Sequence, residues 1–418
     1  MSPGLRSRPL ELDGSVVIVG AGLGGLRSAE ALRAGGFRGT ITMLGAEHHL
    51  PYDRPPLTKQ LLAGAWDEPR VQLASADKLA TLGVALELGV AASALDAATT
   101  TVRLEDGRDL RADAVVLATG AAPRWLPGTE GMRGVHVVRT IEDSTALRDE
   151  LDGLGGAGTV VVIGAGFIGS EVASTARAKG LDVTVLEALD VPLGPVVGDV
   201  VGTWVTELHR REGIEVRAGV AVGRVHPRTA ATAPSVELAS GELVPADVVV
   251  IGIGVRSTTE WLEGSGLTIA DGVVCDESLF AADSIVAVGD LARFRWHNAL
   301  GTEDVRIEHW EVTAQLAAHA AASLLAGSAD AAPVSLVPYF WSDQHGRKIQ
   351  MLGRPIPADE VLHVAGSVEE AKFTVVYHRE GRVAGVLGVA SPRHVMLCRP
   401  LVEAGAALAD ATALFSSP

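Results

Sequence analysis

Two clusters of glycines in this sequence have the spacing that binds nucleotide phosphates. Each reads Gly-x-Gly-x-x-Gly, follows an apolar run and opens a stretch with helical periodicity. In this pattern the first glycine permits a tight turn, the second lets the backbone approach a pyrophosphate, and the third brings helix against strand. The pyrophosphate then lies at the positive end of the helix. The sequence therefore predicts two dinucleotide sites, formed by Gly20, Gly22 and Gly25 and by Gly164, Gly166, Ile168 and Gly169.

An acidic residue follows each glycine cluster where the next strand should end. These residues are Glu47, 22 positions beyond Gly25, and Glu187, 18 positions beyond Gly169. A carboxylate there accepts hydrogen bonds from ribose hydroxyls and repels a 2′-phosphate. Because no arginine or lysine directly follows Glu187, the second site is expected to prefer NADH over NADPH. A nicotinamide can pass hydride to a flavin, so we expect FAD at the first site and NADH at the second.

The segments that must position these sites repeat as well. Residues 102–120 and 236–254 share alternating apolar residues, a turn with glycine, a second short strand, and Ala-Asp before a continuous apolar strand. Continuous apolar strands that alternate with helices are typical of a parallel sheet covered on both faces. The sequence therefore predicts an α/β protein with two Rossmann-like dinucleotide-binding domains.

The order of the segments indicates that the second unit is inserted within the first. Residues 284–290 form another apolar strand, which would complete the first unit, and residues 312–327 have helical character. Beyond an Ala-Pro-rich join, short strands and a hairpin signal predict a small α+β domain. We expect a discontinuous FAD domain at 1–124 and 258–330, an inserted NADH domain at 125–257, and a C-terminal domain at 331–418.

The composition limits where the protein works and what it binds. Its 418 residues carry a net charge of −16, which argues against wholesale binding to nucleic acid or anionic lipid. No apolar run approaches the roughly 20 residues that span a bilayer. The first 14 residues resemble a disordered leader more than a secretion signal. The two cysteines, Cys275 and Cys398, are too far apart for a dithiol motif, so a reducing cytoplasm fits best.

Several local stretches resemble the FAD-dependent, NADH-using ferredoxin reductases that serve Rieske-type dioxygenases and cytochromes P450, the putidaredoxin reductase-like group. PYDRPPLTK at 51–59 looks like that family's PYDRPPLSK segment, and ATGAAPRWLP, SIVAVGD, RIEHW and VPYFWSDQ follow in family order. The resemblance runs from about residue 15 to about residue 400. It implies the glutathione reductase-like two-dinucleotide fold, with a C-terminal domain that covers the flavin.

The resemblance also implies catalytic roles for two charged residues. Lys59 would lie near the reactive edge of the flavin, and Glu171 would pair with it. A positive charge there stabilises electron density arriving on the ring, and the carboxylate keeps the lysine charged and oriented. From their residue types alone, Lys59 and Glu171 would be interpreted as charges on the surface. The family-like segment around Lys59 favours a role at the flavin instead. The further contacts implied for FAD are Glu47, Arg54, Thr119, Gly120, Arg124, Asp290, Glu308, His309 and Trp310, and those implied for NAD include Gly254 and Trp341.

The two tryptophans of this set have an alternative interpretation as core residues. At a cofactor site, large rings exclude water and stack on planar groups. The family's usual Trp-x-Asn-Ala becomes Trp310-Glu311-Val312-Thr313 in this chain. A contact made by that asparagine side chain therefore has no counterpart here.

These inferences combine into one hypothesis, a reductase that takes hydride from NADH onto FAD and passes single electrons to a ferredoxin serving an oxygenase. Redoxins of this kind are generally acidic, so we expect a local basic patch at the docking face, with a merely solvated run of charges as the alternative. Trp296 would be an interface anchor. The candidate cations are Arg293, Arg295, His297, Arg306, Arg347 and Lys348.

Two other functions share this fold. A flavin-dependent disulfide or peroxide reductase needs a redox cysteine facing the flavin, and this chain has none before Cys275. An NADH-sensing interaction protein that resembles apoptosis-inducing factor would be supported by a long transit segment and basic surfaces. The leader here is short and the overall charge is acidic. Rapid turnover with a one-electron acceptor would separate enzyme from sensor.

Overall fold

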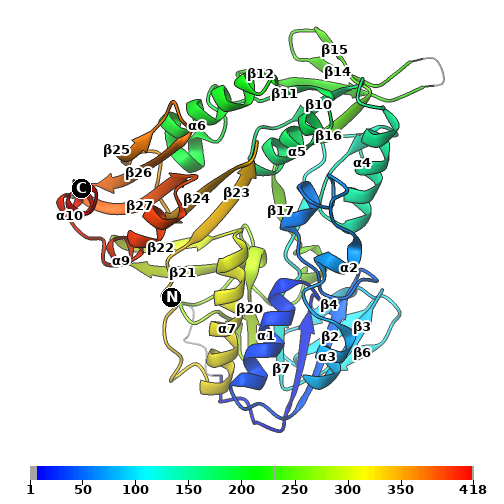
Figure 1. Ribbon diagram of the computed structural model, residues 1–418. Coiled ribbons are helices and arrows are strands. Elements are labelled where there is room, and N and C mark those ends of the chain that lie inside the picture. The colour runs from blue at the N-terminus through cyan, green and yellow to red at the C-terminus, as the bar shows by residue number, and fades with distance from the viewer. Residues whose placement is uncertain (1–6, 230–231, 417–418) are drawn as a thin grey trace. The chain divides into compact units, whose positions relative to one another are not determined.

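The computed structural model describes residues 7–229 and 232–416, and the chain forms two compact units (Figure 1). Residues 54–71 leave the first unit and join the second, an excursion that the sequence patterns do not predict. The three-domain boundaries expected from the sequence stay a prediction. Unit 1 contains the chain up to Asp53, Gln72–Ala122 and Arg256–Tyr339, and unit 2 contains Arg54–Val71, Pro123–Val255 and the chain from Phe340 onward.

Unit 1 is built on a six-stranded sheet in the order β19-β20-β7-β1-β2-β3. All neighbours are parallel except β19, which runs antiparallel to β20. The pairing of β20 with β7 confirms that residues 284–290 supply a strand to the first unit. The strands are β1 (Ser15–Val19), β2 (Thr40–Gly45), β3 (Val84–Leu88), β7 (Ala114–Leu117), β19 (Phe280–Ala282) and β20 (Ile285–Ala287).

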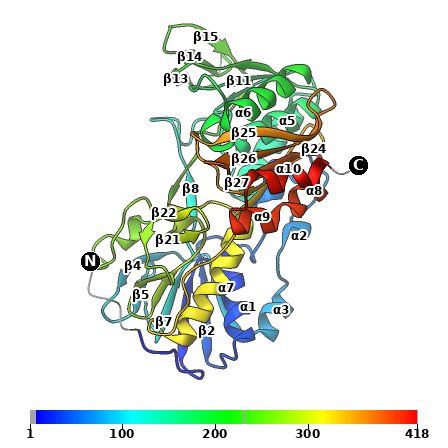
Figure 2. The ribbon, with the colours of Figure 1, turned by 90° about the vertical axis from the view of Figure 1, so that its left-hand side faces the viewer.

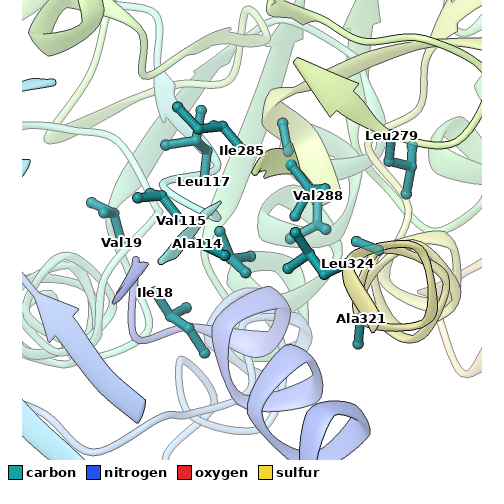
Figure 3. Packing of buried hydrophobic residues seen from close by; sticks show 14 of the residues in the cluster. Ile18, Val19, Ala114, Val115, Leu117, Leu279, Ile285, Val288, Ala321 and Leu324 are labelled. Carbon is teal, nitrogen blue, oxygen red and sulfur yellow. The ribbon is translucent and has the colours of Figure 1, made fainter. Parts of the chain in front are cut away.

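Two helices, α1 (Leu23–Ala34) and α7 (Trp310–Ala326), pack against each other and against this sheet. Figure 3 shows the apolar side chains between them, including Ile18, Ile285 and Leu324, each at most 2% exposed. The apolar runs of unit 1 are therefore buried in one continuous core. Helix α3 (Ala76–Thr81) precedes β3.

Smaller sheets complete unit 1. The hairpin expected within residues 102–120 is present as β5 (Thr101–Leu104) and β6 (Asp109–Arg111), joined by β4 (Ala92–Asp96). A second sheet has the order β18-β21-β22, with β18 (Val273–Val274), β21 (Ala292–Asn298) and β22 (Gly301–Arg306). The short strands β8 (Ala121–Pro123) and β17 (Val255–Ser257) lie where the chain passes between units.

The prediction of a disordered leader is wrong for residues 7–14, the part of it that the structure describes. Residues 1–6 lie outside the described residues, but Ser7 is 6% exposed and Leu10 is 8% exposed. The Ser7 hydroxyl accepts the backbone N–H of Ser284, and the Leu10 N–H donates to the Leu324 carbonyl. This segment is held to unit 1 at Ser284, just before β20, and at Leu324 near the end of α7. Neither contact has a local sequence signal.

Unit 2 contains a five-stranded parallel sheet in the order β12-β11-β10-β16-β9. It repeats the plan of unit 1, with a strand, a glycine turn, a helix and later a hairpin before a buried strand. The predicted second Rossmann-like unit is confirmed. Its elements are β9 (Val135–His136), α4 (Ile141–Gly153), β10 (Thr159–Ile163), α5 (Phe167–Ala178), β11 (Asp182–Leu186), α6 (Gly194–Arg211), β12 (Glu215–Arg217), β13 (Val222–His226), β14 (Ser235–Leu238), β15 (Leu243–Pro245) and β16 (Val248–Ile251).

The C-terminal part of unit 2 is an antiparallel sheet with short helices, as the α+β prediction requires (Figure 2). Apolar residues of α6, such as Val197 and Val201, share a core with Phe373 and Leu387 of this sheet. In the described residues no helix is both long and apolar enough to cross a bilayer. The elements are β23 (Tyr339–Gln344), β24 (Arg347–Gly353), β25 (Glu360–Ser367), β26 (Lys372–Arg379), β27 (Arg382–Val389), α8 (Pro392–Leu397), α9 (Arg399–Ala404) and α10 (Leu408–Ser416).

Candidate functional site

The first glycine cluster forms the turn from β1 into α1. Gly20 has a φ of +119°, and a Cβ on it would lie 2.2 Å from the Ala118 carbonyl oxygen. A Cβ on Gly25 would lie 1.9 Å from the Gly20 oxygen, so both positions require glycine for the fold itself. Around Gly22, in contrast, a Cβ would meet nothing within 4 Å. This glycine leaves open space at the start of the helix, where a pyrophosphate would lie.

The second cluster has the same geometry in unit 2. A Cβ on Gly164 would lie 2.4 Å from the Gly252 oxygen, and one on Gly169 would lie 2.0 Å from the Gly164 oxygen. A Cβ on Gly166 would meet only the Gly252 oxygen, at 4.0 Å. In each turn, two glycines are needed by the fold and one glycine keeps space open. A dinucleotide site requires this division of roles. The residues present therefore fit a dinucleotide in each unit.

The two acidic residues lie just beyond the second strand of their units, as the spacing predicts. Glu187 follows β11 directly; its Oε2 accepts the Ala165 backbone N–H at 2.7 Å, and its Oε1 accepts the Leu189 N–H at 2.9 Å. The Glu187 carboxylate is thus held against the glycine loop. In unit 1, Glu47 accepts the hydroxyl of Tyr52 at 2.5 Å.

Lys59 and Glu171 form an ion pair within unit 2. Lys59 follows the short 3₁₀ turn Pro55–Thr58, and its Nζ lies 2.6 Å from Oε2 of Glu171. The Lys59 side chain is 11% exposed and that of Glu171 is 5% exposed. Both charges are therefore largely removed from water, unlike ordinary surface charges. The family resemblance implied that these two side chains pair, and the structure places them together. Their role at a flavin stays a prediction.

The excursion 54–71 is fixed to unit 2 by side chains of two helices. Ser144 of α4 donates to the Leu57 carbonyl at 2.6 Å, and Thr175 of α5 donates to the Thr58 carbonyl at 2.8 Å. The guanidinium of Arg54 bonds to the Arg139 carbonyl. These contacts hold the turn that precedes Lys59 against the helix that carries Glu171.

Two hydroxyl residues at this ion pair were not among the predicted site residues. Thr58 donates to Oε2 of Glu171 at 2.6 Å, and Ser342 of β23 donates to Oε1 at 2.8 Å. The Asp343 backbone N–H also approaches Oε1, at 3.3 Å. Both hydroxyls lie inside family-like segments, PYDRPPLTK and VPYFWSDQ. That position is the signal by which they could have been found.

The remaining residues predicted for FAD in unit 1 lie at several separate places. Thr119 donates to the Thr258 carbonyl at 3.0 Å, and the adjacent Gly120 has a φ of +66°. Asp290 is half-buried in a 3₁₀ turn after β20. The indole N–H of Trp310 donates to Asp53 at 2.6 Å. His309 is the N-cap residue of α7, and the exposed Glu308 pairs with Arg306.

Other predicted contacts lie in unit 2. Arg124 is exposed, and its guanidinium donates to the Val255 carbonyl at 2.9 Å, beside the exposed Gly254. Ile168 is 45% exposed at the start of α5. Trp341 of β23 is half-buried, with the Lys348 ammonium 5.8 Å from its ring centroid. Their contacts with a cofactor stay predictions.

The cations proposed for a docking patch all have acidic neighbours. Arg295 pairs with Asp304 at 3.1 Å, and Lys348 pairs with Asp343 at 2.8 Å. These carboxylates offset the charges that the sequence interpretation assigned to the surface. The other pairs are Arg293–Asp271, His297–Glu277, Arg306 with Asp271 and Glu308, and Arg347–Glu212.

The prediction of Trp296 as an interface anchor is wrong. Trp296 is 5% exposed, and its indole N–H donates to the Leu336 carbonyl at 3.1 Å. It lies in β21, and its ring belongs to the core of unit 1. Residue type alone does not separate a core tryptophan from a surface one, since both bury a large ring and satisfy one N–H.

The cysteines lack the environment of redox thiols. Cys275 and Cys398 are both free and buried. Burial raises the pKa of Cys275 well above its ordinary range and raises that of Cys398 to about 11. Because the thiolate is the reactive species, neither residue supports dithiol chemistry.

Comparisons with known proteins agree with this arrangement. Residues 14–322 match the pyridine nucleotide-disulphide oxidoreductase family, and residues 339–415 match the reductase C-terminal family. The chain is 36% identical over 390 residues to rhodocoxin reductase of Rhodococcus erythropolis, covering 93% of this chain and 89% of that protein. It is 38% identical over 393 residues to the ferredoxin–NAD(+) reductase component of the anthranilate 1,2-dioxygenase system of Burkholderia cepacia, covering 93% and 94%.

A solved structure gives the same result. A chain of the covalent putidaredoxin reductase–putidaredoxin complex superposes with a TM-score of 0.86 at 32% identity, covering 94% of this chain and 93% of that one. The likeness therefore extends over both matched families and nearly the whole chain.

Proposed function

The chain belongs to the pyridine nucleotide-disulphide oxidoreductase family, and on that premise we propose that it is a flavoprotein reductase that carries electrons from NADH through FAD to a ferredoxin serving an oxygenase. The observation that carries this proposal is the pair of matching glycine turns, one in each unit, each with open space at the second glycine. Relatives named as ferredoxin reductases support the choice of electron acceptor. When bound, FAD accepts two electrons as hydride and releases them singly.

The family implies FAD and NAD(P) as cofactors, and we assign FAD to unit 1 and the nicotinamide cofactor to unit 2. The assignment follows the order of the motifs and the presence of Glu187 in unit 2. Its carboxylate is fixed by two backbone N–H groups, so it cannot turn away from an incoming phosphate without losing both. Burying a second negative charge beside it is unfavourable. NADH is therefore the preferred donor.

Lys59 and Glu171 are the residues to which we assign a role in the reaction. The Lys59 ammonium would stabilise negative charge on the reduced ring, and Glu171 would keep the ammonium oriented. The ion pair at 2.6 Å and its burial support the assignment. Electrostatic stabilisation is stronger in such a water-excluded environment than at a surface.

For the partner, we propose that an acidic ferredoxin docks on a local basic patch that includes Arg293, Arg295 and Arg306 around the β21–β22 hairpin. Each of these arginines already has a carboxylate neighbour. The ferredoxin would therefore replace Asp271 and Asp304 as the partner of the guanidinium groups. Such an exchange favours orientation and association rate over affinity.

The buried cysteines weigh against a disulfide reductase, and a net charge of −16 weighs against the basic surfaces that would support an NADH-sensing interaction protein. The test is to purify the protein, record its flavin absorbance, and measure NADH and NADPH oxidation with plant-type and Rieske-type ferredoxins. The proposal predicts a yellow protein, faster oxidation of NADH, and ferredoxin-dependent turnover. Turnover with a disulfide or peroxide but with no ferredoxin would contradict it.

A further inference from the structure

The carboxylate of Glu171 has more donors than an ion pair needs. Oε2 receives the Lys59 ammonium and the Thr58 hydroxyl, both at 2.6 Å. Oε1 receives the Ser342 hydroxyl at 2.8 Å and the Asp343 N–H at 3.3 Å. One of the four donors is charged and three are neutral.

The three neutral donors lower the cost of breaking the ion pair between Lys59 and Glu171. A buried carboxylate that loses its only partner is strongly destabilised. Hydrogen bonds to a charged group offset part of this loss. With three neutral donors in place, the Glu171 carboxylate stays hydrogen-bonded without Lys59. The ammonium is therefore held by an ion pair that opens at a reduced cost.

The direction of the Ser342 hydroxyl is fixed by a neighbour. The Gln344 amide N–H donates to Ser342 Oγ at 3.0 Å, and both residues are fully buried. A serine hydroxyl has a single proton to donate. Because its oxygen accepts from Gln344, that proton is directed at Glu171. Strand β23 thus supplies an oriented donor to a residue on α5.

We propose that Ser342 is a positioning residue that makes the Lys59–Glu171 pair able to open, so that the Lys59 ammonium can follow negative charge arriving beside it. The proposal rests on the proposed function for the source of that charge, a reduced flavin. The opening of the pair does not depend on it. No bond is made or broken; only the hydrogen-bond partner of the ammonium changes.

The first test measures how readily Lys59 is exposed. The protein as purified is treated with a trace of acetic anhydride, and acetylation of each of its five lysines is followed by mass spectrometry. In S342A the Glu171 carboxylate depends more on Lys59, so acetylation of Lys59 should slow by about tenfold. The other four lysines serve as internal controls. An unchanged or faster rate at Lys59 would overturn the proposal.

Two further variants guard against trivial explanations. S323A removes another buried serine hydroxyl, 2% exposed in α7, and should leave Lys59 acetylation unchanged. S342C keeps the side-chain shape but replaces the hydroxyl with a weaker donor, and should slow Lys59 acetylation as S342A does. If S342A does not fold, S342C decides the question alone.

A second readout separates positioning from simple packing. The midpoint potential of the bound flavin should be more negative in S342A, because the ammonium stabilises the reduced ring less well. In a K59M background, S342A should cause no additional shift. An equal shift with and without Lys59 would overturn the proposal. Neither readout uses ferredoxin, so a failure of electron delivery to ferredoxin is distinguishable from a failure of this inference.

Discussion

The Glu187 carboxylate accepts the backbone N–H of Ala165 at 2.7 Å, which ties the acid beyond β11 to the middle of the glycine loop. The same carboxylate accepts the Leu189 N–H at 2.9 Å. Its position is therefore set by the backbone on both sides. A side chain held in this way is suited to discriminate between a ribose hydroxyl and a phosphate.

Replacing Glu187 by glutamine should relax this discrimination. The E187Q side chain has nearly the same shape but carries no charge, so repulsion of a 2′-phosphate is lost; its single carbonyl oxygen can keep one of the two backbone N–H bonds. We expect the ratio of kcat/KM for NADH over NADPH to fall by about tenfold or more. E47Q, which changes the corresponding acid of unit 1, should leave the ratio unaltered. An unaltered ratio in E187Q would refute the role assigned to it.

The two kinds of glycine in each turn should respond differently to alanine. In G169A the new Cβ would lie 2.0 Å from a backbone oxygen, so the variant should lose about 3 kcal/mol of unfolding free energy or fail to fold. In G166A the new methyl meets only an oxygen at 4.0 Å, so stability should be retained while KM for NADH rises. Thermal unfolding and steady-state kinetics measure the two effects. Equal loss of stability in both variants would contradict the assignment.

Charge reversal on the β21–β22 hairpin tests the docking proposal. R295E should raise KM for an acidic ferredoxin, and the difference from wild type should shrink as salt screens the charges. Reduction of ferricyanide by NADH should not change. R103E, which disrupts the exposed pair between Arg103 of β5 and Asp109 of β6, is the matched control. Ferredoxin reduction that accelerates with salt over the whole range would rule out electrostatic steering.

His209 should make stability depend on pH. Burial, with a smaller contribution from neighbouring His345, lowers the pKa of His209 to about 3. The unfolded chain, with an ordinary histidine pKa of about 6.5, then binds a proton that the folded chain does not. This contribution to stability is complete above about pH 6.5 and is lost as the pH falls toward about 3. Unfolding midpoints of H209N should fall less steeply than wild type over this range; parallel curves would contradict the prediction.

The cysteines should be dispensable for the reaction. C275A and C398A each remove a buried thiol that takes no part in the proposed electron transfer. We expect some loss of thermal stability from the small cavities, with NADH oxidation by ferredoxin retained. Loss of turnover in a folded C275A protein would reopen the disulfide reductase alternative.

The sequence predicted those parts of the fold that local patterns encode. Buried strands appear as apolar runs, and the glycine turns have fixed spacing, so both Rossmann-like units and the return of β20 to the first sheet could be inferred. The pairing of Lys59 with Glu171 required the family resemblance, because neither residue has a local pattern that marks it as buried.

Other features depend on contacts between distant segments. Thr58 and Ser342 reach Glu171 across 113 and 171 positions of the chain. No periodicity shows that residues 54–71 pack on unit 2, or that Trp296 faces the core. Acidic neighbours of the arginines are equally hidden, since Arg293 and Asp271 meet only after the β18–β21 pairing forms.

The most direct test of the central claim is an anaerobic titration of the purified protein with NADH, followed by oxidised ferredoxin. Two nucleotide sites that exchange electrons predict that one equivalent of NADH bleaches the flavin absorbance, and that two equivalents of a one-electron ferredoxin restore it. A protein that holds no flavin, or a bound flavin that NADH does not bleach, would contradict the account.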